Sequence, residues 1–336
     1  MFAELSAGPP LEPPAHAVGR SSSQLVDAGR ADRALAVDCW YPSTGGDEPA
    51  SLYELLPGIG FTATALADAP ALPGPHPLVI WSHGRTATRS MYAMLCEGLA
   101  ARGYVVVATD HPGDTLVDWM TGTAVDDDTN GAQRVDDVRH LIDAVLGGAL
   151  PSVADLDAGR VAVAGHSYGA HTALALAGSE WPDPRVRAVA GLQSFTRTLP
   201  RSVLGRVEVP TLLVAGARDL TTPPDTDADR AFAALGSRDA RRVDIEAAGH
   251  QGCSDVGLYL ELAPHVEGIP EMALDYLGGL AAQVTGRAGD PWRPTVALHL
   301  AILGSWLDEV LVGNASLADL ESVCAVPGVT LRRGDG

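Results

Sequence analysis

The sequence predicts an α/β protein built on a doubly wound, mostly parallel sheet with a helical C-terminal extension. Three observations lead to this fold class. Short runs of aliphatic and β-branched residues recur along the chain, and segments with helical spacing of apolar residues lie between them. A serine flanked by glycines sits where one of these runs passes directly into a helical segment. Alternating strands and helices are typical of a parallel sheet with helices on both faces.

Seven runs have the length and composition of strands. The earliest alternates between polar and apolar residues, and the later ones are mostly continuous, which indicates strands buried on both faces. We expect strands at residues 33–40, 77–82, 104–109, 161–164, 186–192, 211–215 and 241–246.

Four segments between these strands are expected to be helices. Their apolar residues recur at three- and four-residue spacing or are rich in alanine and leucine, which favours an amphipathic or buried helix. They cover residues 90–101, 132–146, 171–177 and 225–235. Each helix would return the chain to the start of the next parallel strand.

The chain divides into an N-terminal segment and one domain. Residues 1–32 are rich in proline, glycine and serine and are expected to be irregular, whereas residues 33–336 are long enough for a single α/β domain. The polar connection at residues 113–131 is expected to form a pocket wall or lid. Residues 258–320 are largely helical, and they could cover the sheet, act as a lid or form the face of a homodimer.

Composition excludes several partners. The chain has 336 residues, 46% of them hydrophobic, and a formal net charge of −19, which disfavours binding to nucleic acid and to anionic membrane surfaces. No stretch approaches the roughly 20 apolar residues of a membrane span. Residues 1–20 lack the positive start and apolar run of a signal peptide. We therefore expect a cytoplasmic protein without integral membrane association.

Two groups of residues raise the question of metal or disulfide sites. The acidic run at residues 126–128 is expected to be a solvated loop, because hard cations need converging oxygens at set spacings. Cys39, Cys96, Cys253 and Cys324 are far apart, as expected for reduced structural thiols, although a bridge between the last two stays open.

Residues 165–169 (GHSYG) match the pattern Gly-x-Ser-x-Gly, which is weak evidence alone. Here a strand-like run enters the motif and a helical run leaves it. Such a sharp turn requires flanking glycines and exposes the Ser167 hydroxyl above the carboxyl ends of the strands. The following helix directs its positive end to the same place. Ser167 is therefore the predicted nucleophile.

A serine nucleophile needs a base and a group that orients the base. After a turn of this type, the expected order along the chain is serine, carboxylate, histidine. Asp219 follows the apolar run at residues 211–215 and a glycine, at the carboxyl end of a strand. His250 follows the last expected strand and a glycine. We predict that His250 is the base and that Asp219 orients it.

Attack on an acyl carbon creates a negative oxygen that backbone amides must stabilise. The expected donors are the amide of Tyr168, after the nucleophile, and one from the loop at residues 82–86, for which we choose Arg85. His111, Trp119 and Met120 follow a strand at the same sheet edge and are candidates to line the substrate pocket, the alternative being that they are ordinary loop and packing residues. This chemistry requires no metal and no organic cofactor.

Four pieces of the chain resemble the bacterial predicted dienelactone hydrolases, which group with the plasma-type platelet-activating-factor acetylhydrolases. The pieces are residues 33–42 (RALAVDCWYP), 81–84 (WSHG), 165–169 (GHSYG) and 250–255 (HQGCSD). The resemblance implies the α/β-hydrolase fold, and its second piece again points to Arg85 as a donor.

The resemblance has two departures. In the acetylhydrolases the acid follows the strand after the nucleophile helix, but residues 191–195 contain no carboxylate here, which favours Asp219. The dienelactone hydrolases proper use a cysteine where Ser167 stands. Neither family's specific reaction is therefore implied.

The expected activity is hydrolysis of a small-molecule carboxylic ester with a short to medium acyl chain, and the chain length rests on the resemblance. The same three residues would also serve acyl transfer to an alcohol or amine, thioester cleavage, or a cofactor-free haloperoxidase side reaction. An alternative from another class is a non-catalytic binding protein on a hydrolase scaffold, against which an intact triad argues.

Overall fold

The computed structural model describes residues 5–56, 59–153, 155–266, 269–287, 289–313 and 319–334. Some positions of the two predicted segments 1–32 and 258–320 lie outside the described residues. These positions are 1–4, 267–268, 288 and 314–318.

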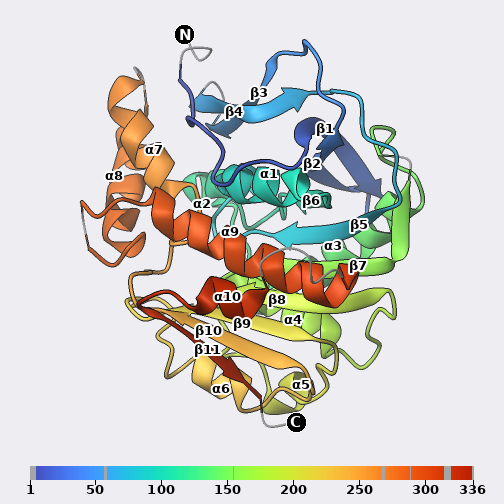
Figure 1. Ribbon diagram of the computed structural model, residues 1–336, viewed down its shortest axis with the longest axis vertical. Coiled ribbons are helices and arrows are strands. Elements are labelled where there is room, and N and C mark those ends of the chain that lie inside the picture. The colour runs from blue at the N-terminus through green and yellow to red at the C-terminus, as the bar shows by residue number, and fades with distance from the viewer. Residues whose placement is uncertain are drawn as a thin grey trace.

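The described strands form one sheet of eleven strands with a parallel centre (Figure 1). Their order is β11-β10-β9-β8-β7-β5-β6-β2-β1-β4-β3, and the strands from β10 to β6 run parallel. All seven predicted strands are present, which confirms the fold class. They are β2 (Arg33–Ser43), β5 (His76–Ser82), β6 (Val105–Thr109), β7 (Leu156–His166), β8 (Val186–Leu192), β9 (Thr211–Gly216) and β10 (Ala240–Ile245).

Four further strands extend the sheet, and the sequence analysis did not predict them. They are β1 (Ala17–Asp27), β3 (Ala50–Leu56), β4 (Ile59–Ala67) and β11 (Val329–Arg333). The prediction of an irregular segment through residue 32 is wrong for β1, which pairs antiparallel with β2 along its whole length. β1 is rich in serine and half-exposed, so it carries none of the continuous apolar pattern that marks the central strands.

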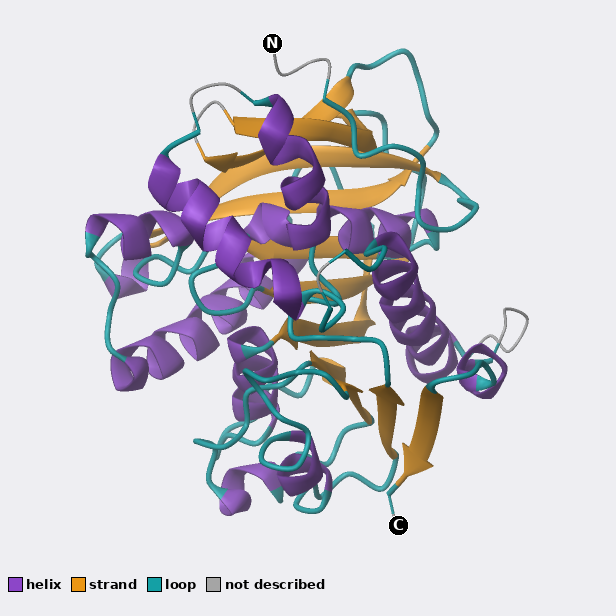
Figure 2. Cartoon of the chain, turned by 90° about the vertical axis from the view of Figure 1, so that its left-hand side faces the viewer, coloured by secondary structure: helices purple, strands orange, loops and turns teal. Residues whose placement is uncertain are grey.

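Helices cover both faces of the sheet (Figure 2). One face packs against helices whose apolar residues share a single core cluster, namely α1 (Ala93–Ala101), α9 (Arg293–Leu307) and α10 (Leu320–Cys324). The opposite face packs against α3 (Asp127–Leu146), α4 (Tyr168–Ala177), α5 (Arg201–Leu204) and α6 (Ala228–Phe232). The doubly wound arrangement follows from these two clusters.

The remaining helical segments lie outside the strand–helix alternation. They are α2 (Leu116–Thr121), α7 (Val256–Leu262) and α8 (Glu271–Leu280), the single 3-10 turns Ala28–Arg30, Arg89–Tyr92, Ala263–His265 and Ala281–Gln283, and a π turn at Asp308–Val312. In Figure 1, α7 and α8 lie together at the left edge of the molecule.

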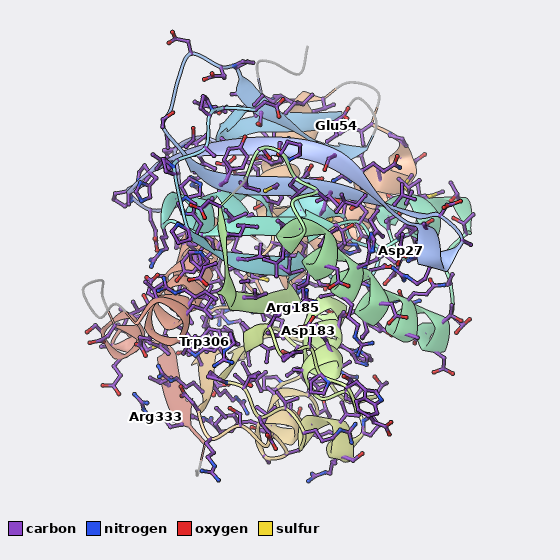
Figure 3. All side chains as sticks on the ribbon, turned by 90° about the vertical axis from the view of Figure 1, so that its right-hand side faces the viewer. Asp27, Glu54, Asp183, Arg185, Trp306 and Arg333 are labelled. Atoms are coloured by element: carbon purple, nitrogen blue, oxygen red, sulfur yellow. The ribbon has the colours of Figure 1, made fainter. Side chains whose placement is uncertain are left out.

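Large aromatic side chains fill the interior, and charged ones pair at the surface. Trp40, Trp81 and Trp306 are fully buried. Figure 3 labels Trp306 together with the surface pair Arg185 and Asp183, whose Nη2 and Oδ2 atoms are 2.6 Å apart. These three side chains are the largest that are fully buried in the described residues, so each removes a large apolar area from water and stabilises the core.

The helix formed by α9 and the π turn, Arg293–Val312, is long and apolar enough by composition to cross a membrane. The sequence analysis expected no such stretch. In the structure 67% of the most apolar window is buried inside the protein. Because α9 packs against α1 and α10, its apolar composition is explained by burial in the core.

Candidate active site

Ser167 occupies a sharp turn between β7, which ends at His166, and α4, which begins at Tyr168. Its backbone angles are φ 53° and ψ −112°, a conformation that non-glycine residues seldom adopt. A Cβ atom on Gly165 would lie 2.6 Å from the Ser82 carbonyl oxygen, and one on Gly169 would collide with the same oxygen. Both flanking glycines are therefore required for the close approach of this turn to β5.

The structure brings the three predicted triad residues together. The Nε2 atom of His250 lies 3.0 Å from Oγ of Ser167, and its Nδ1 atom lies 2.8 Å from Oδ2 of Asp219. All three side chains are buried. Because a carboxylate can only accept, Asp219 fixes the proton on Nδ1 and leaves Nε2 free to accept the hydroxyl proton of Ser167.

Asp219 is held as an anion by four donors. Besides His250, it accepts hydrogen bonds from the backbone amides of Thr221 and Thr222 at 2.8 Å each and from the Thr222 hydroxyl at 2.6 Å. Burial opposes its ionisation, but the hydrogen bonds from His250 and Thr222 outweigh burial and hold the pKa of Asp219 below its usual value.

A second hydrogen-bond chain, which the sequence analysis did not identify, joins the base to the loop after β5. His166 Nε2 lies 2.7 Å from the His250 carbonyl oxygen, and His166 Nδ1 lies 2.8 Å from the Tyr92 hydroxyl. The Gly84 amide in turn donates to that hydroxyl at 3.1 Å. Burial holds the pKa of His166 well below its usual value, so the ring is neutral. Its Nε2 therefore donates to the carbonyl and its Nδ1 accepts from Tyr92.

The loop after β5 is held from behind by Arg134 of α3, which is fully buried. Its guanidinium donates to the carbonyl oxygens of His83 at 2.7 Å and Gly84 at 3.2 Å, and it pairs with Asp114 at 2.8 Å. Asp114 also accepts from the Thr86 amide at 3.2 Å. Arg134 and Asp114 thus fix the backbone groups of His83, Gly84 and Thr86.

The Arg85 side chain connects the same loop to residues 113–131. It pairs with Asp114 and Asp127 and donates to the Val125 carbonyl oxygen at 3.1 Å. Tyr168 donates to the Asp127 carbonyl oxygen at 3.0 Å. The polar connection predicted as a pocket wall therefore supports both of the predicted oxyanion residues.

A pocket of about 250 Å³ opens onto Ser167 and His250. Arg85 lies on its wall, as do Tyr276 and Leu280 of α8. The Tyr276 hydroxyl donates to the Thr86 carbonyl oxygen at 3.4 Å. Both predicted lid segments thus contribute to or adjoin the pocket, while their action as lids stays a prediction.

None of the three predicted pocket residues, Trp119, Met120 and His111, lines this pocket in the structure. The Trp119 ring contacts Tyr276 with centroids 5.4 Å apart, one side chain away from the cavity. Met120 packs instead against the core cluster that α1, α9 and α10 share. Both residues come after β6, but they belong to α2, where the Trp119 side chain is exposed and the Met120 side chain packs against the core.

The prediction that His111 lines the pocket is corrected by its surroundings. His111 is fully buried, with Nε2 2.9 Å from the Ser82 hydroxyl and Nδ1 2.9 Å from Asp137 of α3. The chain turns inward after β6 and places the ring between β5 and α3. His111 thus supports the same loop as Arg134 and has no access to substrate.

Buried neutral histidines make the fold sensitive to acid. Burial lowers the pKa of His111, His171 and His299 to about 4 each. An unfolded chain binds these protons near pH 6.5, so the stabilisation is complete above that pH and is lost as pH falls towards 4. We expect the free energy of unfolding to drop by about 1.4 kcal/mol per pH unit for each histidine.

Urea denaturation at pH 7.5, 5.5 and 4.5 checks this expectation. The variant His299→Gln should show a shallower pH dependence than the native protein. A free energy of unfolding that stays constant between pH 6.5 and 4.5 would contradict it.

The described residues contain neither a group of metal-ligating side chains nor a disulfide. Within them, no three histidine, cysteine or acidic side chains are grouped as metal ligands would be. All four cysteines are free and buried. Asp126, from the acidic run, accepts from the Thr129 amide and caps the start of α3.

Comparisons with known proteins agree with the fold. Residues 61–191 match the chlorophyllase family. The cutinase est1 of Thermobifida alba is 30% identical over 171 residues, which are 50% of this chain and 51% of that protein. The match thus spans about half the length of this curated relative.

A solved structure matches nearly the whole chain. The ferulic acid esterase from Streptomyces cinnamoneus superposes with a TM-score of 0.75 and 28% identity, covering 97% of this chain and 100% of that one. The resemblance to dienelactone hydrolases and acetylhydrolases stays a prediction. The sheet order, the turn at Ser167 and these similarities together show that the chain belongs to the α/β-hydrolase superfamily.

Proposed function

We propose that this protein is a serine-dependent hydrolase that cleaves carboxylic esters with a short to medium acyl chain through an acyl-enzyme. One observation carries the proposal: the hydrogen-bonded chain from Ser167 to His250 to Asp219, with distances of 3.0 and 2.8 Å, ends in an open pocket. A nucleophile, a base and an orienting carboxylate in this order are the parts that acyl transfer needs.

In the proposed reaction Ser167 Oγ attacks the ester carbonyl carbon while its proton passes to Nε2 of His250. The C–O bond to the alcohol then breaks, and His250 returns the proton to the leaving oxygen. Water attacks the acyl-enzyme with His250 again as base, which releases the acid and restores Ser167. Asp219 stays ionised throughout and stabilises the charged imidazole.

We propose that two backbone amides, those of Tyr168 and Arg85, stabilise the negative oxygen. Tyr168 is the first residue of α4, where amides have no acceptor within the helix. In a trans peptide unit the C=O and N–H groups point in opposite directions. Arg134 donates to the Gly84 carbonyl oxygen, so the Arg85 N–H of the same peptide unit points away from Arg134, and Arg85 lines the pocket. This supports Tyr168 and Arg85 as the donors.

The pocket size supports the acyl chain length. A volume of about 250 Å³ lies just below the range of about 300–1,000 Å³ that is usual for drug-sized ligands, which favours a short to medium chain over a long one. The similarity to a protein titled ferulic acid esterase supports an ester as the substrate class.

The test uses p-nitrophenyl acetate, butyrate, octanoate and palmitate, with a fluorophosphonate as covalent probe. We expect turnover of the shorter esters, little turnover of palmitate, and complete loss after the probe labels Ser167, as located by peptide mass spectrometry. Labelling without hydrolysis would favour an acyltransferase and call for an added alcohol or amine acceptor. Neither labelling nor hydrolysis would sink the proposal and favour a binding protein.

The role of Arg134 as a positioning residue gives a separate prediction. Lysine cannot reach both carbonyl oxygens at once, so Arg134→Lys should let the Arg85 amide rotate. We expect kcat to fall about a hundred-fold with KM nearly unchanged. Affinity for a trifluoromethyl ketone analogue of the tetrahedral intermediate should fall by the same factor.

The matched control is Arg139→Lys, on the same helix but at the surface, where the side chain pairs with Asp136. It should leave kcat unchanged. If Arg134→Lys alters thermal stability but neither kcat nor analogue affinity, Arg134 is a purely structural residue.

A further inference from the structure

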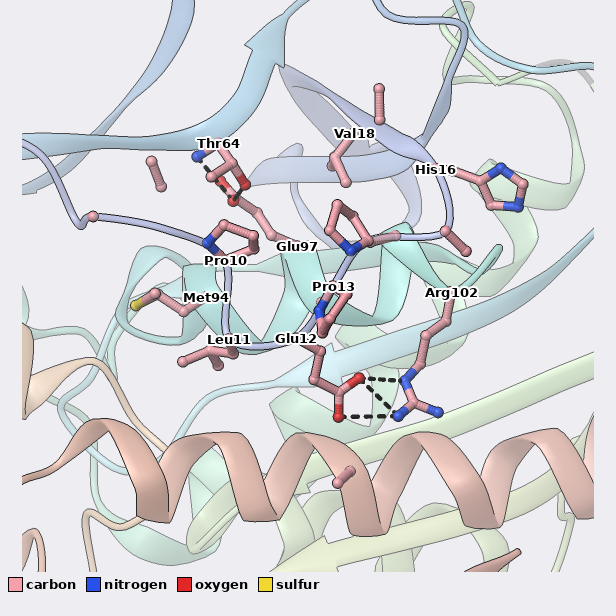
Figure 4. Close-up of a pocket in the computed structure, with 18 of the residues that line it drawn as sticks. Pro10, Leu11, Glu12, Pro13, His16, Val18, Thr64, Met94, Glu97 and Arg102 are labelled. Atoms are coloured by element: carbon pink, nitrogen blue, oxygen red, sulfur yellow. Dashed lines mark hydrogen bonds and ion pairs between the residues drawn. The ribbon is translucent and has the colours of Figure 1, made fainter. Parts of the chain in front are cut away.

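We infer that a cavity beneath the N-terminal segment is a second binding site, which takes a neutral, apolar small molecule. The cavity measures about 600 Å³ and lies between residues 8–18, α1, β4 and α9 (Figure 4). It shares no lining residue with the pocket at Ser167. We call it the N-terminal cavity.

The outer wall of the N-terminal cavity is fastened at both ends. The Ala7 amide donates to the Thr62 carbonyl oxygen at 2.8 Å, and the His16 amide donates to the Ala101 carbonyl oxygen at 3.0 Å. Arg293 of α9 donates to the Ala7 carbonyl oxygen at 2.7 Å. Four prolines between these points, at positions 9, 10, 13 and 14, restrict the backbone further. The wall is therefore preformed and cannot easily collapse onto the helices.

Small residues on the inner wall create the space. Ala101 of α1, Ala301 of α9 and Ala63 of β4 are small residues that line the N-terminal cavity, and Met94 adds an apolar surface. Larger side chains at these places would fill the gap and pack against the segment. The volume lies in the range of 300–1,000 Å³ that is usual for small-molecule sites.

Apart from His16, whose side chain is exposed to solvent, the titratable groups of the wall are paired within the protein. Glu97 accepts from the Tyr53 hydroxyl at 2.5 Å, from the Ala65 amide at 3.1 Å, and from the amide and hydroxyl of Thr64 at 3.1 and 2.5 Å. Arg102 pairs with Glu12 at 2.7 Å and with Asp308 at 3.1 Å. Figure 4 shows Glu97 with Thr64 and Arg102 with Glu12 at separate parts of the wall.

This pairing defines the class of ligand. A charged molecule would enter the N-terminal cavity without a free counter-ion and would lose its hydration. A neutral apolar molecule, such as a long-chain alcohol or ester, would transfer its apolar surface from water into the cavity, which is favourable. Water on these largely apolar walls finds few hydrogen-bond partners, so an apolar occupant is favoured over water in the N-terminal cavity.

Fluorescence titration with N-phenyl-1-naphthylamine, an uncharged apolar probe, tests the inference. We expect saturable binding to the native protein. Ala301→Trp, which fills the N-terminal cavity, should weaken binding at least ten-fold, whereas Leu280→Trp, which fills the pocket at Ser167, should not. The opposite result would place the probe at the active site and overturn the inference, as would no saturable binding at all.

Two additions make the outcome independent of folding and of the proposed function. Ala63→Trp fills the same cavity from β4, so a folded variant is available if Ala301→Trp does not fold. Displacement by 1-decanol should need at least ten-fold less competitor than displacement by decanoate, and equal displacement would overturn the assignment to neutral ligands. Binding is read without turnover, so absence of esterase activity would leave this result unchanged.

Discussion

Ser167→Ala is expected to lower kcat for p-nitrophenyl butyrate by about a million-fold while the fold stays intact. In the proposed mechanism the hydroxyl is the attacking group, and Nε2 of His250 lies 3.0 Å from it. Removing it should leave the pocket and the two proposed oxyanion donors in place, so substrate should still bind. Stopped-time assays at high protein concentration measure the residual rate, and circular dichroism checks the fold.

Two further variants sharpen this result. Ser167→Ala combined with His250→Ala should cost no more than Ser167→Ala alone, because the two residues act as a unit. Ser194→Ala, a buried serine on the loop after β8, serves as the matched control and should keep near-native activity. Residual turnover within a hundred-fold of the native protein would mean that another group is the nucleophile.

Asp219→Asn is expected to reduce kcat about ten thousand-fold with little change in KM. An asparagine amide can present a donor to Nδ1 of His250, which would stabilise the tautomer with its proton on Nε2. That tautomer cannot accept the Ser167 proton. Steady-state kinetics on p-nitrophenyl butyrate measure the loss, and Asp225→Asn, exposed a few residues further on, is the control.

The second acid position known from the acetylhydrolase resemblance can be tested on the same background. Gln193 stands after β8, but its Nε2 atom lies 2.7 Å from Nε2 of His299, so its side chain is engaged elsewhere. Adding Gln193→Glu to Asp219→Asn should therefore restore no activity. Recovery of ten-fold or more would show that the carboxylate can act from either strand.

The three triad residues could be predicted from the sequence, because each is located by the strand that precedes it in the chain. Ser167, Asp219 and His250 each follow a strand of the parallel centre, and the carboxyl ends of such strands meet at one sheet edge. The turn at Ser167 was also predictable, because its glycines are demanded by local sterics. These inferences need only local patterns and one rule of topology.

Other features depend on contacts that no local pattern records. His111 follows a strand end as Asp219 does, but whether a side chain turns to the pocket or to α3 depends on packing between distant segments. From the sequence, Arg134 is an ordinary polar residue of an amphipathic helix and would be expected at the surface. It is buried because α3 packs against the loop after β5. β1 was missed because its polar residues resemble those of a loop.

The chain of hydrogen bonds from Gly84 through Tyr92 and His166 to the His250 carbonyl oxygen has a consequence for protein engineering. It links the loop that would receive the substrate oxygen to the residue that would move the proton. Grafting a foreign loop after β5 would displace Tyr92 and with it the support of His250. Libraries that vary the loop after β5 should therefore vary Tyr92 and His166 together with it, because the three are joined by hydrogen bonds.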